Sequence, residues 1–462
     1  MSREYRLDFA LLGRAWAKDV RVAVDSAGLI SAIDADAPAS SGAERVSGYV
    51  VPGMPNGHSH AFQRAMAGDT EYRLSARDSF WTWRQAMYAL ANRVAAEDLQ
   101  VIATQLFVEM LKAGYTSVGE FHYLHRRPDG GLESGANPLW DAITAAAEAT
   151  GISLTLLPTL YQTSDFGAKP LRADQARFQL DTELFLRAVE ERVSSERRLG
   201  STHRRTGAAF HSLRAVPMES LRNAVSGLAA IDPEMPLHIH IAEQRKEVAA
   251  CVAHTGRRPI ELLLESGLVN RHWCLVHATH ATPQELDAIA ASCAAVCVSI
   301  STEANLGDGF FDAARFLRAG GRICVGSDSQ ATVCPAEELR WMEYQARLRK
   351  RRRNVLADKT AAHVGTRLWS HAASEGGRAL GQPAGSIAVG SRADWLVLDP
   401  RHPSMAGAAT EAVLDRLLFA GGSGAIRDVM VAGRWVVKER RHPAETAALA
   451  AYRTLTDRLR AG

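Results

Sequence analysis

The feature that most limits the possible folds of this chain is a regular alternation of short apolar segments with helical patterns between residues 52 and 375. Eight apolar segments have the length of β-strands, and they lie at 50–55, 116–125, 152–161, 207–216, 236–244, 272–280, 294–302 and 322–329. Amphipathic patterns separate several of them, at 98–114, 137–151, 219–231 and 283–293. This alternation predicts an α/β fold, a (β/α)8 barrel of the TIM type with insertions.

A doubly wound open sheet is the competing architecture. Such a sheet usually carries a glycine-rich phosphate loop after its first strand, and the segment after 50–55 has none. Polar residues recur instead at nearly every predicted strand end, as they do at the active face of a barrel. The barrel is therefore the favoured prediction.

The two ends of the chain have a different pattern. Residues 1–51 contain short alternating runs such as VRVAVDSAGLISAI, and the C-terminal part contains GSIAVGSRADWLVLD and DVMVAGRWVVKERR. We predict that residues 1–51 and 376–462 form a small composite β-sandwich domain, followed by a C-terminal helix. The barrel is then expected to occupy residues 52–375.

Composition and charge exclude several classes of partner. The formal net charge of +3 is too small to indicate nucleic-acid or membrane binding, and no run of eighteen apolar residues occurs. The N-terminus lacks the apolar core of a signal peptide, and the six cysteines form no CxxC pair, so a cytoplasmic protein with reduced thiols is expected. The basic run 347–353 (RLRKRRR) is interpreted as a solvated helix face.

His58 and His60 follow the first predicted barrel strand, in the sequence PGMPNGHSH. On an extended backbone, residues two positions apart point to the same face, so both imidazoles can reach one metal ion. A single pair of this kind is a weak signal. It gains weight only if other strand ends supply further ligands.

Other strand ends do supply them. His238 and His240 lie at the end of the fifth strand, His277 at the end of the sixth and Asp328 at the end of the eighth. A catalytic zinc ion takes imidazole and carboxylate ligands and keeps one position open. We predict the ligand set His58, His60, His240 and Asp328. A metal ion there would lower the pKa of a coordinated water from about 15.7 toward 7.

Catalytic roles follow from the same positions. Asp328 can accept a proton from the water, and Glu243, three residues after His240, can pass a proton to a leaving nitrogen. His277 can orient or deprotonate the water, or stabilise developing charge. His238 is not needed by a tetrahedral site, so we interpret it as a structural or supporting residue.

Several longer motifs resemble the amidohydrolase superfamily over nearly the whole chain. They include PGMPNGHSHAFQRAMAG, GEFHYLH, FHSLRAV, HIHIAEQ, LVHATH, STEANLGDG and VGSDS. Members with two metal ions use a carboxylated lysine at the end of strand four, and segment 207–216 contains no lysine. The resemblance therefore implies the mononuclear deaminase type, with one Zn²⁺ per subunit and pairing into homodimers. Another divalent metal, iron or manganese, stays open, because these metals share His and Asp ligands.

Within the superfamily the motifs are most similar to the formimidoylglutamate deiminases, apart from Gly57, where an apolar side chain is commoner. The resemblance implies a small dicarboxylate substrate, N-formimino-L-glutamate, hydrolysed to N-formyl-L-glutamate and ammonia in histidine degradation. It assigns substrate binding to Gln63, Arg84, Tyr123, His211 and Arg214, and catalysis to Glu243, His277 and Asp328. Arginine suits carboxylates through paired hydrogen bonds, and Arg84 lies in an insertion that could cover the site.

Two alternatives stay open at this point. One is another mononuclear deaminase that acts on a nucleobase-like heterocycle, whose pocket would favour aromatic stacking over paired arginines. The other is a catalytically inactive barrel used as a scaffold. Loss of metal ligands would be expected for a scaffold, whereas all four predicted ligands are present.

Overall fold

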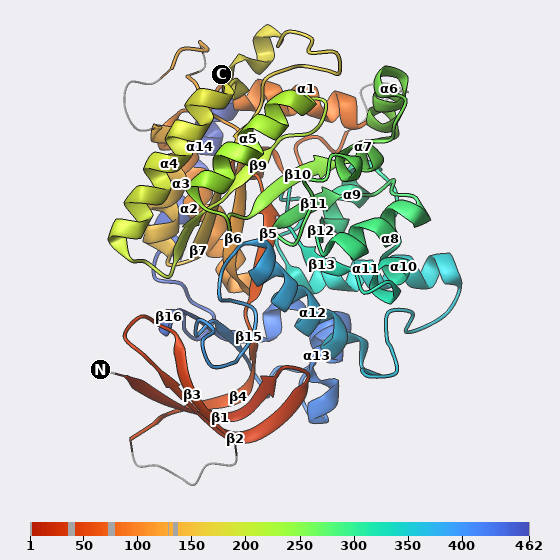
Figure 1. Ribbon diagram of the computed structural model, residues 1–462. Coiled ribbons are helices and arrows are strands. Elements are labelled where there is room, and N and C mark those ends of the chain that lie inside the picture. The colour runs from red at the N-terminus through yellow and green to blue at the C-terminus, as the bar shows by residue number, and fades with distance from the viewer. Residues whose placement is uncertain (1, 36–41, 73–78, 128, 133–136, 462) are drawn as a thin grey trace.

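The centre of the molecule is a parallel barrel (Figure 1). The computed structural model describes residues 2–35, 42–72, 79–127, 129–132 and 137–461. In these ranges the barrel strands are β5 (Met54–Ser59), β6 (Tyr115–His122), β7 (Ser153–Leu160), β9 (Ala208–Phe210), β10 (Leu237–Ile241), β11 (Trp273–His277), β12 (Ala295–Val298) and β13 (Arg322–Val325). The short β8 (Arg204–Thr206) pairs with β7. The predicted (β/α)8 barrel is confirmed.

The barrel closes between its last and first strands. The backbone N–H groups of Ser327 and Asp328 each donate to the carbonyl of His58 at 3.0 Å, and His60 N–H donates to the carbonyl of Asp328 at 3.1 Å. Nearly all strand residues are buried, as expected for parallel strands that helices cover on the outside. Closure therefore brings the predicted ligands of the first and last strands together.

Helices surround the barrel (Figure 1). Those that the structure describes between its strands are α1 (Phe80–Ala91), α2 (Ala96–Ala113), α3 (Pro138–Thr150), α4 (Thr182–Leu199), α5 (Met218–Ile231), α6 (Arg245–Thr255), α7 (Pro259–Glu265), α8 (Pro283–Ser292), α9 (Ile300–Leu306) and α10 (Ala313–Arg318). α11 (Pro335–Lys350) and α12 (Val364–Ala379) follow the last barrel strand. Local sequence sets their ends: α3 starts at an Asn137 cap followed by Pro138, and it stops at Gly151, whose φ is 77°.

The chain ends pair into a second sheet. Its described strands are β1 (Arg3–Leu12), β2 (Ala15–Val24), β3 (Ile30–Asp34), β4 (Glu44–Pro52), β14 (Trp395–Leu398), β15 (Ile426–Val431) and β16 (Arg434–Val437). β4 joins the two ends, since it pairs in parallel with β1 and antiparallel with β14. A separate core, which includes Tyr5 packed edge-on against Trp395, supports this sheet. The predicted pairing of the two termini is confirmed.

The first barrel strand starts later than predicted. Segment 50–55 was expected to be one strand, but β4 ends at Pro52 in the terminal sheet and β5 begins at Met54 in the barrel. Gly53 lies between them, where a Cβ atom would come within 2.3 Å of the Thr116 side chain. The chain thus passes from one sheet to the other at a position where only glycine fits, and His58 lies inside β5 rather than after it.

Two further helices lie near the predicted domain limits. α12 packs on β5 and β13, and residue 375 falls within it. The C-terminal helix α14 (Glu445–Ala461) packs on α2 of the barrel, where the Tyr452 hydroxyl donates to the Arg64 carbonyl at 3.0 Å. The chain therefore crosses back from the terminal sheet to the barrel before it ends.

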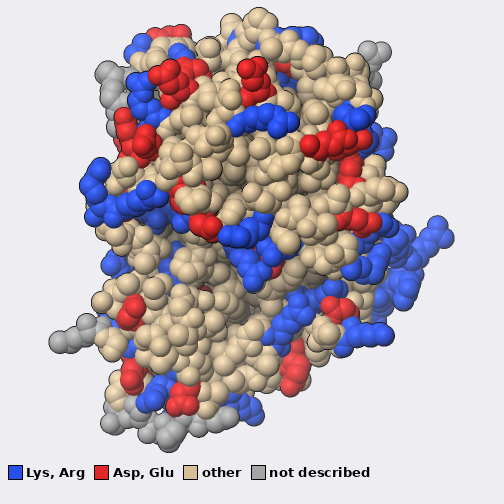
Figure 2. Space-filling model, in the orientation of Figure 1, with Lys and Arg blue, Asp and Glu red and all other residues tan. Residues whose placement is uncertain are grey.

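Charged side chains of both signs are spread over the surface, with lysines and arginines gathered at the right-hand edge of the view in Figure 2. The basic run ends α11, and residues 349–353 are all exposed, in agreement with a solvated helix end. Among the described residues, no helix combines the length and the apolar character that crossing a membrane requires.

Candidate metal centre and active site

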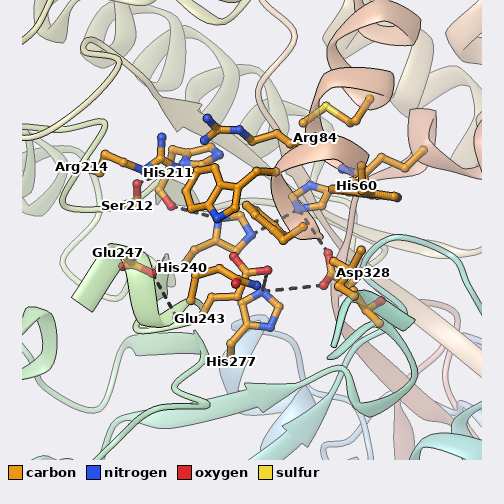
Figure 3. A pocket seen from close by; sticks show the side chains of 18 of the residues that line it. His60, Arg84, His211, Ser212, Arg214, His240, Glu243, Glu247, His277 and Asp328 are labelled. Carbon is orange, nitrogen blue, oxygen red and sulfur yellow. Dashed lines mark hydrogen bonds and ion pairs between the residues drawn. The ribbon is translucent and has the colours of Figure 1, made fainter. Parts of the chain in front are cut away.

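Three imidazoles and one carboxylate converge at the carboxyl-terminal end of the barrel (Figure 3). The Nε2 atoms of His58, His60 and His240 lie 3.0–3.3 Å from one another. Asp328 Oδ1 lies 3.5 Å from the Nε2 atoms of both His58 and His60. Ligand atoms about 2.0–2.1 Å from a tetrahedral zinc ion are about 3.4 Å apart, so this spacing fits one such ion.

The protonation of these imidazoles also suits a cation. Burial lowers the pKa of His58 to about 3 and lowers the pKa values of His60 and His240 as well. The Nδ1–H of His60 donates to the Phe121 carbonyl at 2.8 Å, and the Nδ1–H of His240 donates to the His211 carbonyl at 2.9 Å. These bonds leave the Nε2 lone pairs facing one another, an arrangement that a bound metal ion would stabilise.

The backbone is strained at these strand ends. Asp328 and His277 have φ values of 47° and 71°, in the left-handed region that residues other than glycine rarely adopt. Such strain costs on the order of 1–3 kcal/mol per residue and is typical of functional sites. Burial alone would raise the pKa of Asp328, but the neighbouring His58 and His277 outweigh it and lower that pKa below its usual range. Asp328 is thus a carboxylate that can bind a cation.

Glu243 and His277 lie beside the ligand cluster. His277 Nε2 is 3.7 Å from Glu243 Oε1 and 3.7 Å from Asp328 Oδ2. Burial raises the pKa of Glu243 to about 7, so its carboxyl group can both donate and accept a proton near neutral pH. Burial alone would lower the pKa of His277, but the surrounding carboxylates, led by Glu243, raise it to about 10. The pair is suited to proton transfer.

The predicted substrate-binding residues all line the same cavity as the ligand cluster, although they come from separate elements. They are Gln63 on the 3-10 turn Ala61–Met66, Arg84 on α1 (Phe80–Ala91), Tyr123 after β6, and His211 and Arg214 after β9. Gln63 Nε2 donates to the Tyr123 hydroxyl at 2.8 Å, so these two side chains orient each other. Figure 3 shows Arg84, His211 and Arg214 across the cavity from His277.

The two arginines have no carboxylate partner within ion-pair distance among the described residues. Arg84 lies against two aromatic rings, with its guanidinium carbon 4.4 Å from the Trp81 centroid and 5.4 Å from that of Tyr88. Its Nη1 is buried and has no hydrogen-bond partner in the described part of the chain. Burial lowers the pKa of Arg84, and Arg214 adds to this effect. Two neighbouring cations of this kind are suited to bind an anion.

Sequence reasoning assigned no role to three residues of this region. Glu303 on α9 contacts His277 at 3.3 Å, and the aromatic ring of Trp81 packs on Arg84. Glu247 on α6 accepts the backbone N–H groups of Ala242 and Glu243 and so fixes the Glu243 loop. Glu303 and Glu247 each follow a strand end by a few residues, the signal that could have identified them. Trp81 carried no such signal.

His238 has the structural position that was predicted. It is fully buried beneath the ligand cluster, and its Nε2–H donates to the Ala379 carbonyl at 2.8 Å. Three cysteines lie in the same interior layer, Cys274, Cys297 and Cys324, and they are free thiols. Gly57 faces this layer, since a Cβ atom there would come within 2.9–3.0 Å of two cysteine sulfurs. The missing side chain at Gly57 thus makes room for sulfur.

An eight-stranded parallel barrel with three imidazoles and a carboxylate at its strand ends defines the class of metal-dependent barrel hydrolases. The comparison with protein families agrees, because the model of the amidohydrolase family matches residues 49–436. The chain belongs to the amidohydrolase family.

Individual relatives extend this result. The chain is 49% identical over 443 residues to a formimidoylglutamate deiminase from Pseudomonas aeruginosa, a match that covers 96% of each chain. A crystal structure of an amidohydrolase from Brucella melitensis superposes with a TM-score of 0.92 at 39% identity, over 99% of both chains. An adenosine deaminase from Xanthomonas campestris with bound zinc has a TM-score of 0.81 at 22% identity, over 99% of this chain and 98% of that one, and shows the fold alone.

Proposed function

We propose that the protein hydrolyses N-formimino-L-glutamate to N-formyl-L-glutamate and ammonia. The observation that carries this proposal is a pair of arginines, Arg84 and Arg214, in the same cavity as the ligand cluster; neither has a carboxylate within ion-pair distance among the described residues. The substrate has two carboxylates and an amidine, so it can place one end at the arginines and the other at the metal centre. The near-full-length identity to a formimidoylglutamate deiminase supports the same substrate.

His58, His60, His240 and Asp328 would hold one zinc ion per subunit, and such an ion would polarise the amidine and acidify water. Arg84 and Arg214 would bind the carboxylates through charge-assisted hydrogen bonds and fix the position of the formimino carbon. Gln63, Tyr123 and His211 line the space between the two ends of the substrate. This arrangement sets the reacting carbon beside Glu243, His277 and Asp328.

The hydrolysis moves both protons of one water molecule to the terminal nitrogen. Water adds to the formimino carbon while His277, whose pKa of about 10 keeps it protonated at neutral pH, orients the water and Asp328 receives its first proton. Glu243, whose pKa lies at about 7, donates a proton to the terminal nitrogen. As the C–N bond to that nitrogen breaks, Asp328 returns its proton to the nitrogen and Glu243 takes the proton of the new hydroxyl group. Ammonia leaves, the carbon keeps the oxygen as a formyl group, and both carboxyl groups return to their starting states. Atoms and charge balance without another reactant.

The remaining expectations stay part of this proposal. A metabolic hydrolase of this type is expected to be cytoplasmic and to form a homodimer. We also keep the division into a barrel of residues 52–375 and a composite domain of residues 1–51 and 376–462. The pairing of β4 with both β1 and β14 supports the composite domain.

The direct test is ammonia release by zinc-loaded protein from N-formimino-L-glutamate, with guanine and cytosine as parallel substrates. The proposal predicts release from the formimino substrate alone. Release from a heterocycle alone would keep the metal centre but overturn the substrate and the roles of both arginines. No release from any of the three by protein that holds zinc would favour an inactive scaffold.

A further inference from the structure

Glu303 is a buried carboxylate that no step of the proposed reaction uses. It lies on α9, just after β12, and none of its surface is exposed to solvent. One of its oxygens, Oε1, lies 3.3 Å from Nδ1 of His277 and accepts the backbone N–H of Ser299 at 3.2 Å. The other oxygen, Oε2, is buried and has no hydrogen-bond partner among the residues that the structure describes.

Helix capping alone does not account for this residue. A glutamate in the first turn can reach back to the N–H that precedes its helix, and the bond to Ser299 has this form. A cap functions equally well at the surface, however, and burial of a carboxylate is costly unless a cationic or hydrogen-bonding partner compensates for it. Among the described residues, His277 is the basic side chain within ion-pair distance of Glu303.

The contact determines how His277 faces the site. A carboxylate oxygen only accepts hydrogen bonds, so His277 uses Nδ1–H toward Glu303. Its other nitrogen, Nε2, then faces Glu243 and Asp328, each at 3.7 Å. The backbone angle φ of His277, 71°, does not set the rotation of the ring about its side-chain bonds. Glu303 supplies the missing constraint from the opposite side of the ring.

A second contact fixes the place of Glu303 itself. The backbone N–H of Asp308 donates to the Glu303 carbonyl at 2.9 Å, and the Asp308 side chain accepts a hydrogen bond from Gln244. Gln244 is the residue next to Glu243. The loop after α9 is thus tied to the loop that carries Glu243, and His277 lies between them.

We propose that Glu303 is a positioning residue for the reaction: it holds the His277 ring by its Nδ1–H so that Nε2 faces the reacting atoms. This inference rests on the proposed function for its substrate but concerns only the relation between Glu303 and His277. Loss of the partner that orients a metal-ligating histidine typically costs about 10–100-fold, and we expect a loss of the same order for the partner of His277.

The test compares Glu303→Gln with a matched control, Glu338→Gln. Glu338 is equally buried and also bonds to α9, through the backbone N–H and the hydroxyl of Ser301, but it does not touch His277. Glu303→Gln is expected to lower kcat about 10–100-fold with an unchanged KM and a full zinc content. Glu338→Gln is expected to keep the kcat of the wild type. An unchanged kcat in Glu303→Gln overturns the proposal.

A double-mutant cycle separates positioning from a general structural role. In a His277→Ala background, Glu303→Gln is expected to cause no further loss, because the ring that it orients is absent. An equal loss in both backgrounds, or a loss of zinc in Glu303→Gln, would assign Glu303 to the scaffold instead. Wild-type protein that releases no ammonia from N-formimino-L-glutamate would refute the proposed function, a result that the variants cannot mimic.

Discussion

Two groups of buried histidines lie at the carboxyl ends of barrel strands, and they differ in how their ring nitrogens are satisfied. After β6, His125 donates from Nε2 to the Thr159 carbonyl at 2.7 Å and accepts the Trp140 indole N–H at Nδ1. At β10, the Nδ1–H of His240 donates to a carbonyl, but its Nε2 faces two other imidazole nitrogens at 3.0–3.3 Å. Both ring nitrogens of His125 thus have a hydrogen-bond partner in the protein, whereas Nε2 of His240 faces only other imidazole nitrogens.

The difference shows what identifies a metal centre in this fold. Both histidines are buried, both follow or end a parallel strand, and burial lowers the pKa of each. Residue type, position and pKa therefore do not separate them. The difference is that ring nitrogens from separate strands converge, with no protein donor between them. Of the two groups compared here, only that of His58, His60 and His240 has this property.

The largest effect is expected from breaking the convergent group. His240→Ala removes one of the predicted ligands, and ammonia release should fall by about 10⁴-fold or more, since the acidification of water depends on the metal. His125→Gln should keep its zinc and most of its turnover. Steady-state kinetics with metal analysis on both variants make the comparison. Retained zinc and turnover in His240→Ala would contradict the assigned ligand set.

Glu243→Gln tests a residue that lies beside the convergent histidines. The substitution removes a proton carrier and leaves the metal ligands in place. Turnover is expected to fall by about 10²–10⁴-fold, the usual scale for general acid–base catalysis, with zinc content unchanged. Rapid-quench measurement of the first turnover shows whether the chemical step is slowed. Near-normal turnover would remove Glu243 from the proton-transfer role.

Arg214→Met and Arg84→Met test the opposite side of the cavity. Each should raise KM for N-formimino-L-glutamate about 10–100-fold, because a charge-assisted hydrogen bond contributes about 1.5–3 kcal/mol. Zinc content should stay at the wild-type level. Arg172→Met is the control, since Arg172 already pairs with Asp174 at 3.0 Å. If Arg214→Met, Arg84→Met and the control Arg172→Met all have the same KM, neither Arg214 nor Arg84 binds the substrate.

The last prediction concerns stability and leaves catalysis unchanged. The pKa of His125 is lowered to about 4 by burial, below the unfolded value of about 6.5, so the unfolded chain binds the proton first. The contribution of the neutral, buried His125 ring to the free energy of unfolding is complete above pH 6.5. It falls by about 3 kcal/mol as the pH falls toward 4. Urea unfolding should therefore show that the difference in stability between wild type and His125→Gln narrows over this range. A constant difference would contradict this account of His125.

The barrel and the convergence of the candidate ligands could be predicted from the sequence, because these residues end regular strands. His58, His60, His240 and Asp328 repeat one local pattern, a polar side chain where an apolar segment stops. The closure of the barrel then brings them together without further information. The strand predicted at 50–55 was wrong because two strands of different sheets follow each other there, separated by Gly53 alone.

Other features depend on contacts between segments that are distant in the sequence. Arg84 looks like a surface residue of an amphipathic helix, and only the packing of α1 over the barrel brings it to the cavity. Glu303 reaches His277 from a different strand connection, 26 residues further along the chain. Such pairings have no local signal, so the sequence alone predicted neither the neighbours of Arg84 nor the role of Glu303.

The most direct test of the central claim is the position of the metal in crystals of zinc-loaded protein, located by anomalous scattering at the zinc edge. The account predicts one peak per chain, bonded to Nε2 of His58, His60 and His240 and to a carboxylate oxygen of Asp328. A principal peak elsewhere, such as among His238 and the buried cysteines, would contradict it. So would a second peak of equal height in the same cavity.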